Sequence, residues 1–544
     1  MAANLAALAN DVETPVGLRD FVEFQGGILY VAHDHVTDSR VVEFEMRLAR
    51  LGLLHRKKGC ALAEISQLRS NKRNVNKQNT TGVDNRNGEL ATAIDFLRQG
   101  VAMGASDIHF KFLNGTVEVK MRVDGYLNSY FELTERSILP VIQAMYVAAD
   151  GKNTSQWGFN KPIAARIVNR DVLPEGLYAV RFASMPADRG GVVVLRLLYD
   201  SVNTRSVAAK KEVDTTDLLR NLGFRDNQIT DLQEMASSPN GIILITGPTG
   251  AGKSTTLKYT MQWLNANYPH LNILTVEDPP EYPIVGATQI PVLVQDDDAE
   301  DLGARSRVYG SVIATTLRLD PDVLMIGEIR DGSSAIAAMR AAETGHRVWS
   351  TLHANDAWET VTRMTDLLRE GEMAEPLSVL ANTQNLTGLV AQRLVPRLCP
   401  NCKIPLTDNM DKMPDNVLNE LFSAIPNFDA KKVYLRGDGC DTCVPMANGD
   451  KQKQHSDNRR GIKGRTVVCE VIRPDQPLLD IARNKGIPQA RRYWLKHKGG
   501  RTIIDHALEK IMEGVIDPVV ARDFVGPLIS GEQSLASMDS EILD

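Results

Sequence analysis

The segment GPTGAGKS at residues 247–254 constrains the fold more than any other part of the sequence, because it fits the pattern G-x-x-x-x-G-K-[ST]. It follows the apolar run GIILIT at 241–246, which predicts a strand, and it precedes TTLKYTMQWLNA at 255–266, which predicts a helix. In this context the glycines let backbone N–H groups surround an anionic phosphate, and the start of the helix adds positive potential. The sequence therefore predicts a nucleotide-phosphate site.

The residues expected to bind the nucleotide are contiguous. Lys253 is expected to reach the β- and γ-phosphates, and the hydroxyl of Ser254 is expected to bind Mg²⁺. ATP and Mg²⁺ are therefore the predicted ligands. The complete predicted binding set is Gly247, Pro248, Thr249, Gly250, Ala251, Gly252, Lys253, Ser254 and Thr255.

Three later segments each consist of an apolar strand that ends in a polar side chain. NILTVED ends in Glu277 and Asp278, DVLMIGEI carries Glu328, and RVWSTLHAND contains His353. Strands that alternate with helices predict a parallel sheet, in which ligands bind beyond the carboxyl ends of the strands. These side chains are therefore candidate catalytic residues, expected to meet beside the nucleotide.

The candidates differ in their expected roles. Glu328 is placed to polarise an attacking water, with a charge at a helix N-terminus as the alternative. Gly327 precedes it where such strands usually carry a Mg²⁺-linked aspartate, so Glu277 or Asp278 is a candidate for that task, with a solvated loop pair as the alternative. His353 is either a site residue or a structural histidine.

Four of the six cysteines form two pairs, Cys399-x-x-Cys402 and Cys440-x-x-Cys443. Two such pairs close a tetrahedral site of four sulfurs that suits structural Zn²⁺. Two disulfide bonds are the alternative, which a reducing cytosol disfavours. The other two cysteines stand alone and are expected to be small buried residues.

Composition excludes several classes of protein. Hydrophobic residues make up 43% of the 544 residues and charged residues 24%, as in a globular chain rather than a disordered or fibrous one. The 62 basic and 68 acidic residues give a net charge of −6, without the basic excess typical of DNA-coating or membrane-surface proteins. No apolar run is long enough to span a membrane, and MAANLAALANDVE lacks the basic region of a secretory signal. A cytoplasmic location is expected.

The chain divides into segments of different character. The runs IHFKF and TVEVKMRVDGYL alternate apolar and polar residues around Asn114 and Gly115, which predicts a β-hairpin, and further strands are expected at 177–184 and 191–198. The predicted divisions are a partner-docking region at 1–70, a linker at 71–88, a small α/β domain at 89–200, a linker at 201–216, and a larger α/β domain at 217–544 that contains the cysteine insert 399–443 and a C-terminal helical region.

Taken together, these segments resemble the secretion traffic ATPases, the motors of type II secretion and type IV pilus assembly. The resemblance extends over about residues 89–525, roughly four-fifths of the chain. It is carried by GPTGAGKSTTL, TVEDPPEY, LRLDPDVLMIGEIRD, TGHRVWSTLHANDA and LVAQRLVPRLCPNCK, by ASDIHF, RVDGYL, VRFASMP and VVVLRLL in the N-terminal half, and by GRTVVCEVI and GGRTIIDHALEKIMEG near the C-terminus.

The resemblance implies a PAS-like α/β domain followed by a RecA-like P-loop domain, with the nucleotide bound between them. Arginines of the smaller domain then approach the phosphates. Arg122, Arg181 and Arg196 lie in matching segments and are the candidates, an exposed strand arginine being the alternative for each.

The same resemblance assigns other residues to family motifs. Glu277 and Asp278 fall in the Asp box, and Glu328 falls in an atypical Walker B motif. The His box contains His346 and His353, and Arg330 matches an arginine near the domain junction.

The resemblance also implies a homohexamer that drives an inner-membrane platform protein and is attached to the membrane only through such partners. A tetracysteine insert favours pilus assembly or type II-like secretion over retraction, because retraction motors generally lack it. The chain departs from the family pattern at 162–166, at 190–191, and at Ser311 and Ala314, where assembly motors often carry arginines. These departures are typical of a diverged branch, such as the thin-pilus systems of conjugative plasmids.

Two other functions remain open on the sequence. One is a RecA-like nucleic-acid motor with a zinc ribbon, against which the absence of a basic excess counts. The other is a nucleotide-gated scaffold that binds ATP without cycling. No direct contact with nucleic acid is expected.

Overall fold

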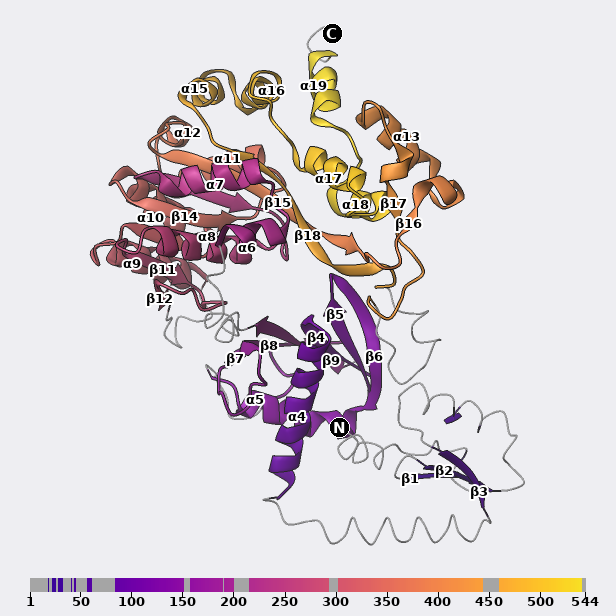
Figure 1. Ribbon diagram of the computed structural model, residues 1–544. Helices are drawn as coiled ribbons and strands as arrows, with labels where there is room; N and C mark the ends of the chain where they lie inside the picture. Colours follow the sequence, from indigo (N-terminus) through magenta and orange to yellow (C-terminus); the bar gives the residue numbers. More distant parts are fainter. Residues whose placement is uncertain are drawn as a thin grey trace. The chain divides into compact units, whose positions relative to one another are not determined.

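The computed structural model describes residues 84–150, 157–188, 190–199, 215–292, 302–443 and 459–540, together with Leu18, 22–25, 28–32, Val41, 44–45 and 56–60. These residues belong to two compact units, one made of Met1–Asp200 and Met446–Asn458 and the other of Ser201–Pro445 and Arg459–Asp544 (Figure 1). Each unit is described by itself. Among the described residues, no helix combines the length and the apolar character needed to cross a bilayer.

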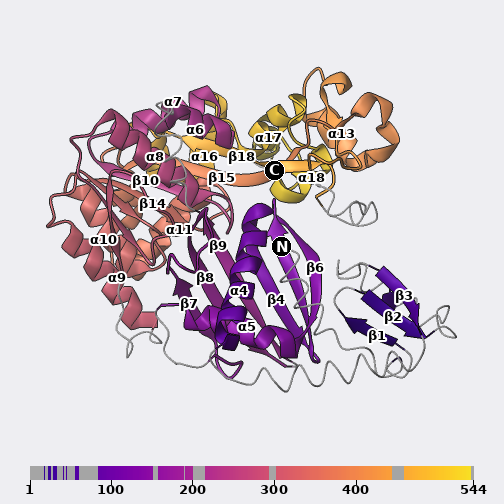
Figure 2. The same cartoon turned by 60° about the horizontal axis from the view of Figure 1, so that its bottom comes forward.

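The first unit contains a six-stranded sheet in the order β6-β5-β4-β9-β8-β7, in which every neighbouring pair is antiparallel. The helices α4 and α5 cover one face of this sheet (Figure 2). Its elements are α4 (Asp84–Ala102), β4 (Ala105–Leu113), β5 (Thr116–Val123), β6 (Tyr126–Thr134), α5 (Glu135–Val147), β7 (Ile163–Ile167), β8 (Leu177–Ala187) and β9 (Gly190–Tyr199).

Alternation along the strands explains why this sheet has one apolar face. Ile108, Phe110 and Phe112 of β4 are buried against the helices, whereas the residues between them point to the opposite face. The predicted hairpin is present, because Asn114 and Gly115 adopt positive φ angles of 51° and 80° between β4 and β5.

The linker predicted at 71–88 overlaps with the first long helix. The helix α4 begins at Asp84, inside the linker predicted at 71–88, because helix formation extends into the polar residues that precede its apolar stripe. Of the region predicted at 1–70, the structure describes a small sheet in the order β1-β2-β3, formed by β1 (Val22–Gln25), β2 (Ile28–Ala32) and β3 (Arg56–Cys60). Apart from Leu18, Val41 and 44–45, the rest of that region lies outside the described residues, as does most of the linker predicted at 201–216.

The second unit contains a seven-stranded sheet in the order β12-β11-β13-β14-β10-β15-β18, parallel except for the antiparallel last strand. Its inner strands are buried on both faces, as their continuous apolar runs predict. The strands are β10 (Gly241–Thr246), β11 (Ile273–Glu277), β12 (Ala287–Pro291), β13 (Val323–Ile326), β14 (Arg347–Leu352), β15 (Leu386–Leu398) and β18 (Ile462–Ile472).

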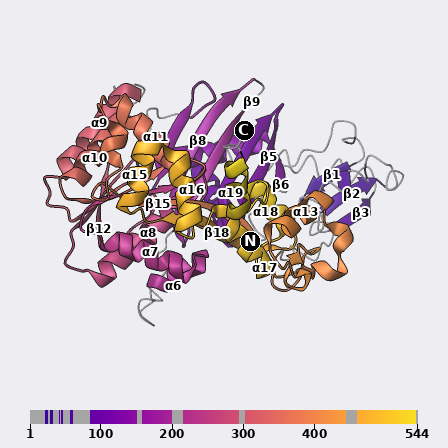
Figure 3. The ribbon, with the colours of Figure 1, turned by 90° about the horizontal axis from the view of Figure 1, so that it is seen from above.

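Two separate apolar clusters fill the two faces of this sheet. One face packs against α6 (Thr215–Leu222), α7 (Asp226–Ser237) and α8 (Lys253–Asn267), and the other packs against α9 (Leu302–Thr316), α10 (Gly332–Glu343) and α11 (Ala357–Glu370) (Figure 3). The unit is completed by α12 (Pro376–Leu380), α15 (Gln476–Lys485), α16 (Ile487–His497), α17 (Ile503–Met512), α18 (Pro518–Val525) and α19 (Gly531–Ser540). The predicted fold class, two α/β parts of which the second has a parallel sheet, is confirmed.

A small segment follows β15 and carries the paired cysteines. It contains the two-stranded antiparallel sheet of β16 (Ile404–Pro405) and β17 (Tyr434–Leu435), with α13 (Asp415–Ala424) between them. The apolar side chains of α13 continue the larger of the two clusters of the second unit. The cysteine segment is therefore packed onto the second unit rather than set apart from it.

Candidate nucleotide-binding site

The strand ends of the second unit meet at one edge of the sheet. Thr246 of β10 lies beside Leu352 of β14, and Ile326 of β13 lies beside Val276 of β11. Because these strands are parallel, the segments that follow them all begin at this edge. The polar side chains that follow these strands therefore start from the same edge of the sheet.

The glycine-rich loop after β10 is fixed by a side chain that the sequence analysis did not single out. Gln392 of β15 is fully buried, its amide nitrogen donates to the carbonyl of Ala251 at 2.7 Å, and its oxygen accepts from Thr256 Oγ1 at 3.0 Å. Gly247 has a φ of 145°, and a Cβ atom there would lie 2.2 Å from the Gln392 carbonyl oxygen. Only glycine fits at position 247, and this close contact between the two backbones holds the loop against β15.

Lys253 begins α8 and stays close to its own loop. Its ammonium group donates to the carbonyls of Gly247 at 2.7 Å and Pro248 at 3.3 Å. Burial lowers the pKa of Lys253, and the negative charges of Glu328 and Glu281 raise it in part. Of the remaining predicted binding residues, those exposed to solvent are Pro248, Thr249, Gly250 and Ser254.

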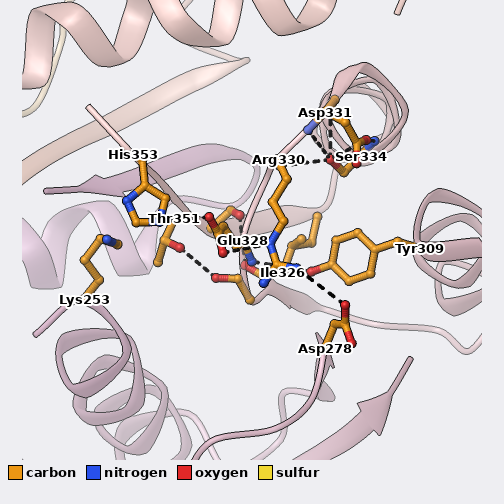
Figure 4. A network of polar contacts seen from close by, with 12 residues as sticks. Lys253, Asp278, Tyr309, Ile326, Glu328, Arg330, Asp331, Ser334, Thr351 and His353 are labelled. Atoms are coloured by element: carbon orange, nitrogen blue, oxygen red, sulfur yellow. Dashed lines mark hydrogen bonds and ion pairs between the residues drawn. The ribbon is translucent and has the colours of Figure 1, made fainter. Parts of the chain in front are cut away.

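Glu328 follows β13, and its carboxylate contacts two side chains, one a cation and the other a histidine. One of its oxygens lies 3.0 Å from His353 Nε2, and the other accepts from Arg330 Nε at 2.9 Å. Figure 4 shows Lys253 on one side of Glu328 and Tyr309 on the other. The carboxylate is about one-quarter exposed, so it remains open to a ligand while its orientation is fixed.

The two acidic residues at the end of β11 occupy different environments. Glu277 is buried and accepts from Thr275 Oγ1 and Gln289 Nε2, each at 2.8 Å. Burial raises the pKa of Glu277, against the effect of these hydrogen bonds. Asp278 instead accepts from Arg305 at 2.9 Å and lies 3.5 Å from Arg330. Neither residue is a solvated loop carboxylate.

The two histidines of the predicted His box lie at opposite ends of one strand. His353 follows β14 at the edge that holds Glu328. His346 precedes β14, and its ring nitrogen contacts Thr344 Oγ1 at 3.1 Å and the carbonyl of Ala341 at 3.2 Å. The structure therefore brings His353 into the cluster and leaves His346 out of it.

The first unit carries the predicted arginines on the sheet face opposite its helices. Asp107 of β4 pairs in register with Arg122 of β5 and Arg196 of β9, Arg196 pairs with Arg181 of β8, and Arg181 pairs with Arg166 of β7. Residues in register point to the same face of a sheet, so these side chains form one line. We call Arg122, Arg196, Arg181 and Arg166 the arginine row.

Asp107 is the acidic residue within the arginine row. Its carboxylate accepts from Arg196 Nε at 2.9 Å and lies 3.9 Å from Arg122 Nε. Arg122 also donates to the carbonyl of Gly125 at 2.9 Å. Arg166 was not among the predicted site residues, because only strand pairing brings it into line with the other three.

The four paired cysteines converge to one point. The Sγ atoms of Cys399 and Cys440 are 3.6 Å apart, those of Cys402 and Cys443 are 3.8 Å apart, and all four lie within 4.8 Å of one another. A tetrahedral zinc site with bonds of about 2.3 Å places its sulfurs about 3.8 Å apart. The donor set therefore fits such an ion, and none of these four cysteines forms a disulfide.

The sequence also matches known proteins over most of its length. Residues 90–522 match the model of the family described as "Type II/IV secretion system protein". The chain belongs to this family. It is 34% identical over 429 residues to the type II secretion system ATPase E of Vibrio cholerae, a match that covers 77% of this chain and 72% of that protein.

A second relative extends the comparison to pilus assembly. The chain is 30% identical over 431 residues to the type IV pilus assembly ATPase PilB of Thermus thermophilus, covering 78% of this chain and 42% of that protein. The prediction of a P-loop ATPase is confirmed at the level of the family, because both relatives are named ATPases.

A solved structure supports the fold. The pilus retraction motor PilT with bound ADP aligns with a TM-score of 0.50 at 23% identity, over 79% of this chain and 96% of that one. At this identity the likeness concerns the fold alone. It agrees with an antiparallel sheet followed by a mostly parallel one.

Proposed function

We propose that this protein is an ATPase that drives pilus assembly or type II-like secretion. The observation that carries the proposal is the meeting of Lys253, Glu328 and His353 at one edge of a parallel sheet, inside the segment that matches the family. The loop before α8 supplies backbone N–H groups for the phosphates, and Lys253 supplies a positive charge. The hydroxyl of Ser254 and one of the acidic residues at the end of β11 hold Mg²⁺, which neutralises phosphate charge when bound.

In this proposal Glu328 activates the attacking water. Its carboxylate is partly exposed and held on two sides, which suits a group that orients a water and accepts its proton. His353 donates to Glu328 and keeps its oxygens aligned. The resemblance to the family adds Arg122, Arg181 and Arg196 to this proposal as candidate contacts of the phosphates.

The test is a pair of substitutions in the full chain. Lys253→Ala is expected to remove ATP binding and to lower turnover at least 100-fold, since the main phosphate-facing charge is lost. Glu328→Gln is expected to retain ATP and to lower turnover by about 10² to 10⁴-fold, the usual contribution of a general base. Phosphate release and binding of a fluorescent nucleotide report the two effects separately.

The controls are exposed residues of the same types. Lys485→Ala at the end of α15 and Glu343→Gln at the end of α10 should leave both measurements unchanged. Turnover by Lys253→Ala at the parent rate would show that the site is elsewhere. A parent protein that binds ATP without turnover, alone or with membranes, would favour the nucleotide-gated scaffold.

We also propose that the four cysteines bind one structural Zn²⁺. Support comes from the distances between their Sγ atoms, which match a tetrahedral set of four sulfurs. Zinc would tie the end of β15 to the segment before β18, because Cys399 and Cys440 come from these two parts of the chain. Metal analysis should find one zinc per chain and none in Cys440→Ser. A lower melting temperature of that variant would accompany the loss, and a parent chain without zinc would contradict the assignment.

The remaining parts of the proposal concern the partners of the protein and its location in the cell. A cytoplasmic homohexamer that acts on an inner-membrane platform protein is supported by membership of the secretion family and by the relatives in type II secretion and pilus assembly. The region 1–70 would dock a partner. The departures at Ser311 and Ala314 support a diverged branch, such as one serving the thin pili of conjugative plasmids.

A further inference from the structure

The helix α9 carries two side chains that reach the strand ends of the candidate site. Arg305 and Tyr309 are four residues apart and therefore lie on the same side of the helix. This side faces the ends of β11 and β13, where Asp278 and Glu328 begin their segments. Neither residue stood out in the sequence.

Tyr309 connects the two strand ends through its hydroxyl. The hydroxyl donates to the carbonyl of Val276 at 3.3 Å and accepts from the backbone N–H of Glu328 at 3.4 Å. Figure 4 shows the ring of Tyr309 pointing toward the Glu328 segment. The side chain is 7% exposed, and burial raises its pKa, so the hydroxyl keeps its proton. A buried group that bonds both strand ends fixes the point at which Glu328 leaves the sheet.

Arg305 fixes the neighbouring carboxylate. Its Nε donates to one Asp278 oxygen at 3.1 Å, and its terminal nitrogen lies 2.9 Å from both oxygens. Arg330 lies between Asp278 and Glu328, at 3.5 Å and 2.9 Å. The plane of the Asp278 carboxylate and the direction of Glu328 are thus set together.

The helix that carries these residues is itself held closely. A Cβ atom at Gly310 would lie 2.3 Å from Ser333 Oγ of α10, so α9 and α10 approach each other at this point. The helix α10 begins directly after the segment that contains Glu328, and Asp331 caps it by accepting from Ser334 N at 2.8 Å. A displacement of α9 would therefore disturb both ends of the segment that joins β13 to α10 and contains Glu328.

We propose that Tyr309 and Arg305 are positioning residues for ATP hydrolysis, Tyr309 acting through the backbone of Glu328 and Arg305 acting through the carboxylate of Asp278. The proposal rests on the function proposed above. Small displacements of a reacting group lower turnover without weakening substrate binding, because binding depends on other contacts. A side chain that only fills the core has no such selective effect.

The decisive variant is Tyr309→Phe, which keeps the ring and removes the hydroxyl. The two hydrogen bonds are at the long end of the range, so the expected fall in kcat is about 3- to 10-fold. The KM for ATP and the melting temperature should stay within about twofold and about 2 °C of the parent, respectively. The matched control is Tyr268→Phe, which removes a hydroxyl bonded to Ser237 at 3.1 Å from the far end of α8.

Arg305 is tested by two variants and a double-mutant cycle. Arg305→Lys keeps the charge but cannot hold both oxygens of Asp278 in one plane, so it should lower kcat nearly as much as Arg305→Ala. In an Asp278→Asn background, Arg305→Ala should have little further effect, since its partner is already lost. Arg369→Lys, in the exposed pair with Asp366, is the control.

The outcomes separate this proposal from the function on which it rests. An unchanged kcat in Tyr309→Phe, or a full rescue of Arg305→Ala by lysine, would overturn the positioning role while leaving ATP hydrolysis intact. Equal loss of kcat, ATP affinity and melting temperature would also overturn it, because that pattern indicates a structural role. Failure of the proposed function shows up differently, as a parent protein whose ATP turnover equals that of Lys253→Ala.

Discussion

Asp278 in the parallel-sheet unit and Asp107 in the antiparallel-sheet unit are each placed between two arginines, but their surroundings differ in charge. Around Asp278, the two guanidinium groups of Arg305 and Arg330 are matched by two carboxylates, because Arg330 also pairs with Glu328. Around Asp107, the four guanidinium groups of the arginine row are accompanied in register by the carboxylate of Asp107 and, next to Arg166, by that of Asp150.

This difference in surrounding charge indicates different roles for the two regions. In a balanced network each charge has a partner, so its hydrogen bonds can fix the direction of Glu328 and Asp278. A row of four arginines on a partly exposed sheet face is suited to an anion such as a polyphosphate. We therefore expect the removal of an acid to harm the first region and to strengthen anion binding by the second.

A third acidic residue extends the comparison. Among the described contacts, no arginine side chain forms a hydrogen bond with it. Glu470 of β18 is buried and accepts from the backbone N–H of Ala357 at 2.6 Å. Burial raises its pKa to about 7 from an ordinary value of 4.5, against the effect of that hydrogen bond. Between these two values the folded chain retains a proton that the unfolded chain releases, so the stability contributed by this group falls as pH rises.

The largest expected effect follows from this third acid. Between pH 4.5 and pH 8, Glu470→Gln should gain up to about 3 kcal/mol of unfolding free energy relative to the parent. The measurement is urea denaturation of both full chains across that range. Glu343→Gln, an exposed acid, should show no such relative gain. If the free energy of unfolding changed with pH in the same way for Glu470→Gln and the parent, the result would contradict this prediction. It would mean that nearby charges stabilise the Glu470 carboxylate as fully as arginines stabilise that of Asp278.

A smaller effect is expected for Asp278→Asn. The loss of one negative charge leaves Arg305 and Arg330 in excess, and Arg330 is then free to draw Glu328 away from its position. Turnover should fall about 30-fold, or about 2 kcal/mol, and ATP affinity should fall less than turnover, because Lys253 and the loop before α8 still bind the phosphates. Steady-state kinetics over a range of ATP concentrations checks this. A variant with the parent's kcat would show that the network has no positioning role.

The smallest effect, and one of opposite sign, is expected for Asp107→Asn. Removing the acid within the arginine row should tighten nucleotide binding about two- to fivefold, since Asp107 is buried but its two arginine partners are 39% and 47% exposed and screened by solvent. Titration of a fluorescent ATP analogue at two salt concentrations measures the change, and the gain should shrink at high salt. An unchanged affinity would separate the arginine row from the nucleotide.

Much of the fold and part of the candidate site could be predicted from the sequence. The apolar strands each end in a distinctive side chain, and parallel pairing brings Lys253, Glu328 and His353 to one edge. The environments of Glu277 and Asp278 could not be predicted. They differ by one position in the chain, yet one is buried with Thr275 and the other faces Arg305.

The sequence by itself determined the features that depend on local spacing. These are the glycine-rich loop, the alternation that builds the first sheet, and the paired cysteines, because short-range geometry fixes which backbone and side-chain groups such patterns present. Tertiary structure decided the partners of those features. The lines from Asp107 to Arg166 and from Tyr309 to Glu328 join residues on different strands and helices, and only strand register and helix packing bring them together.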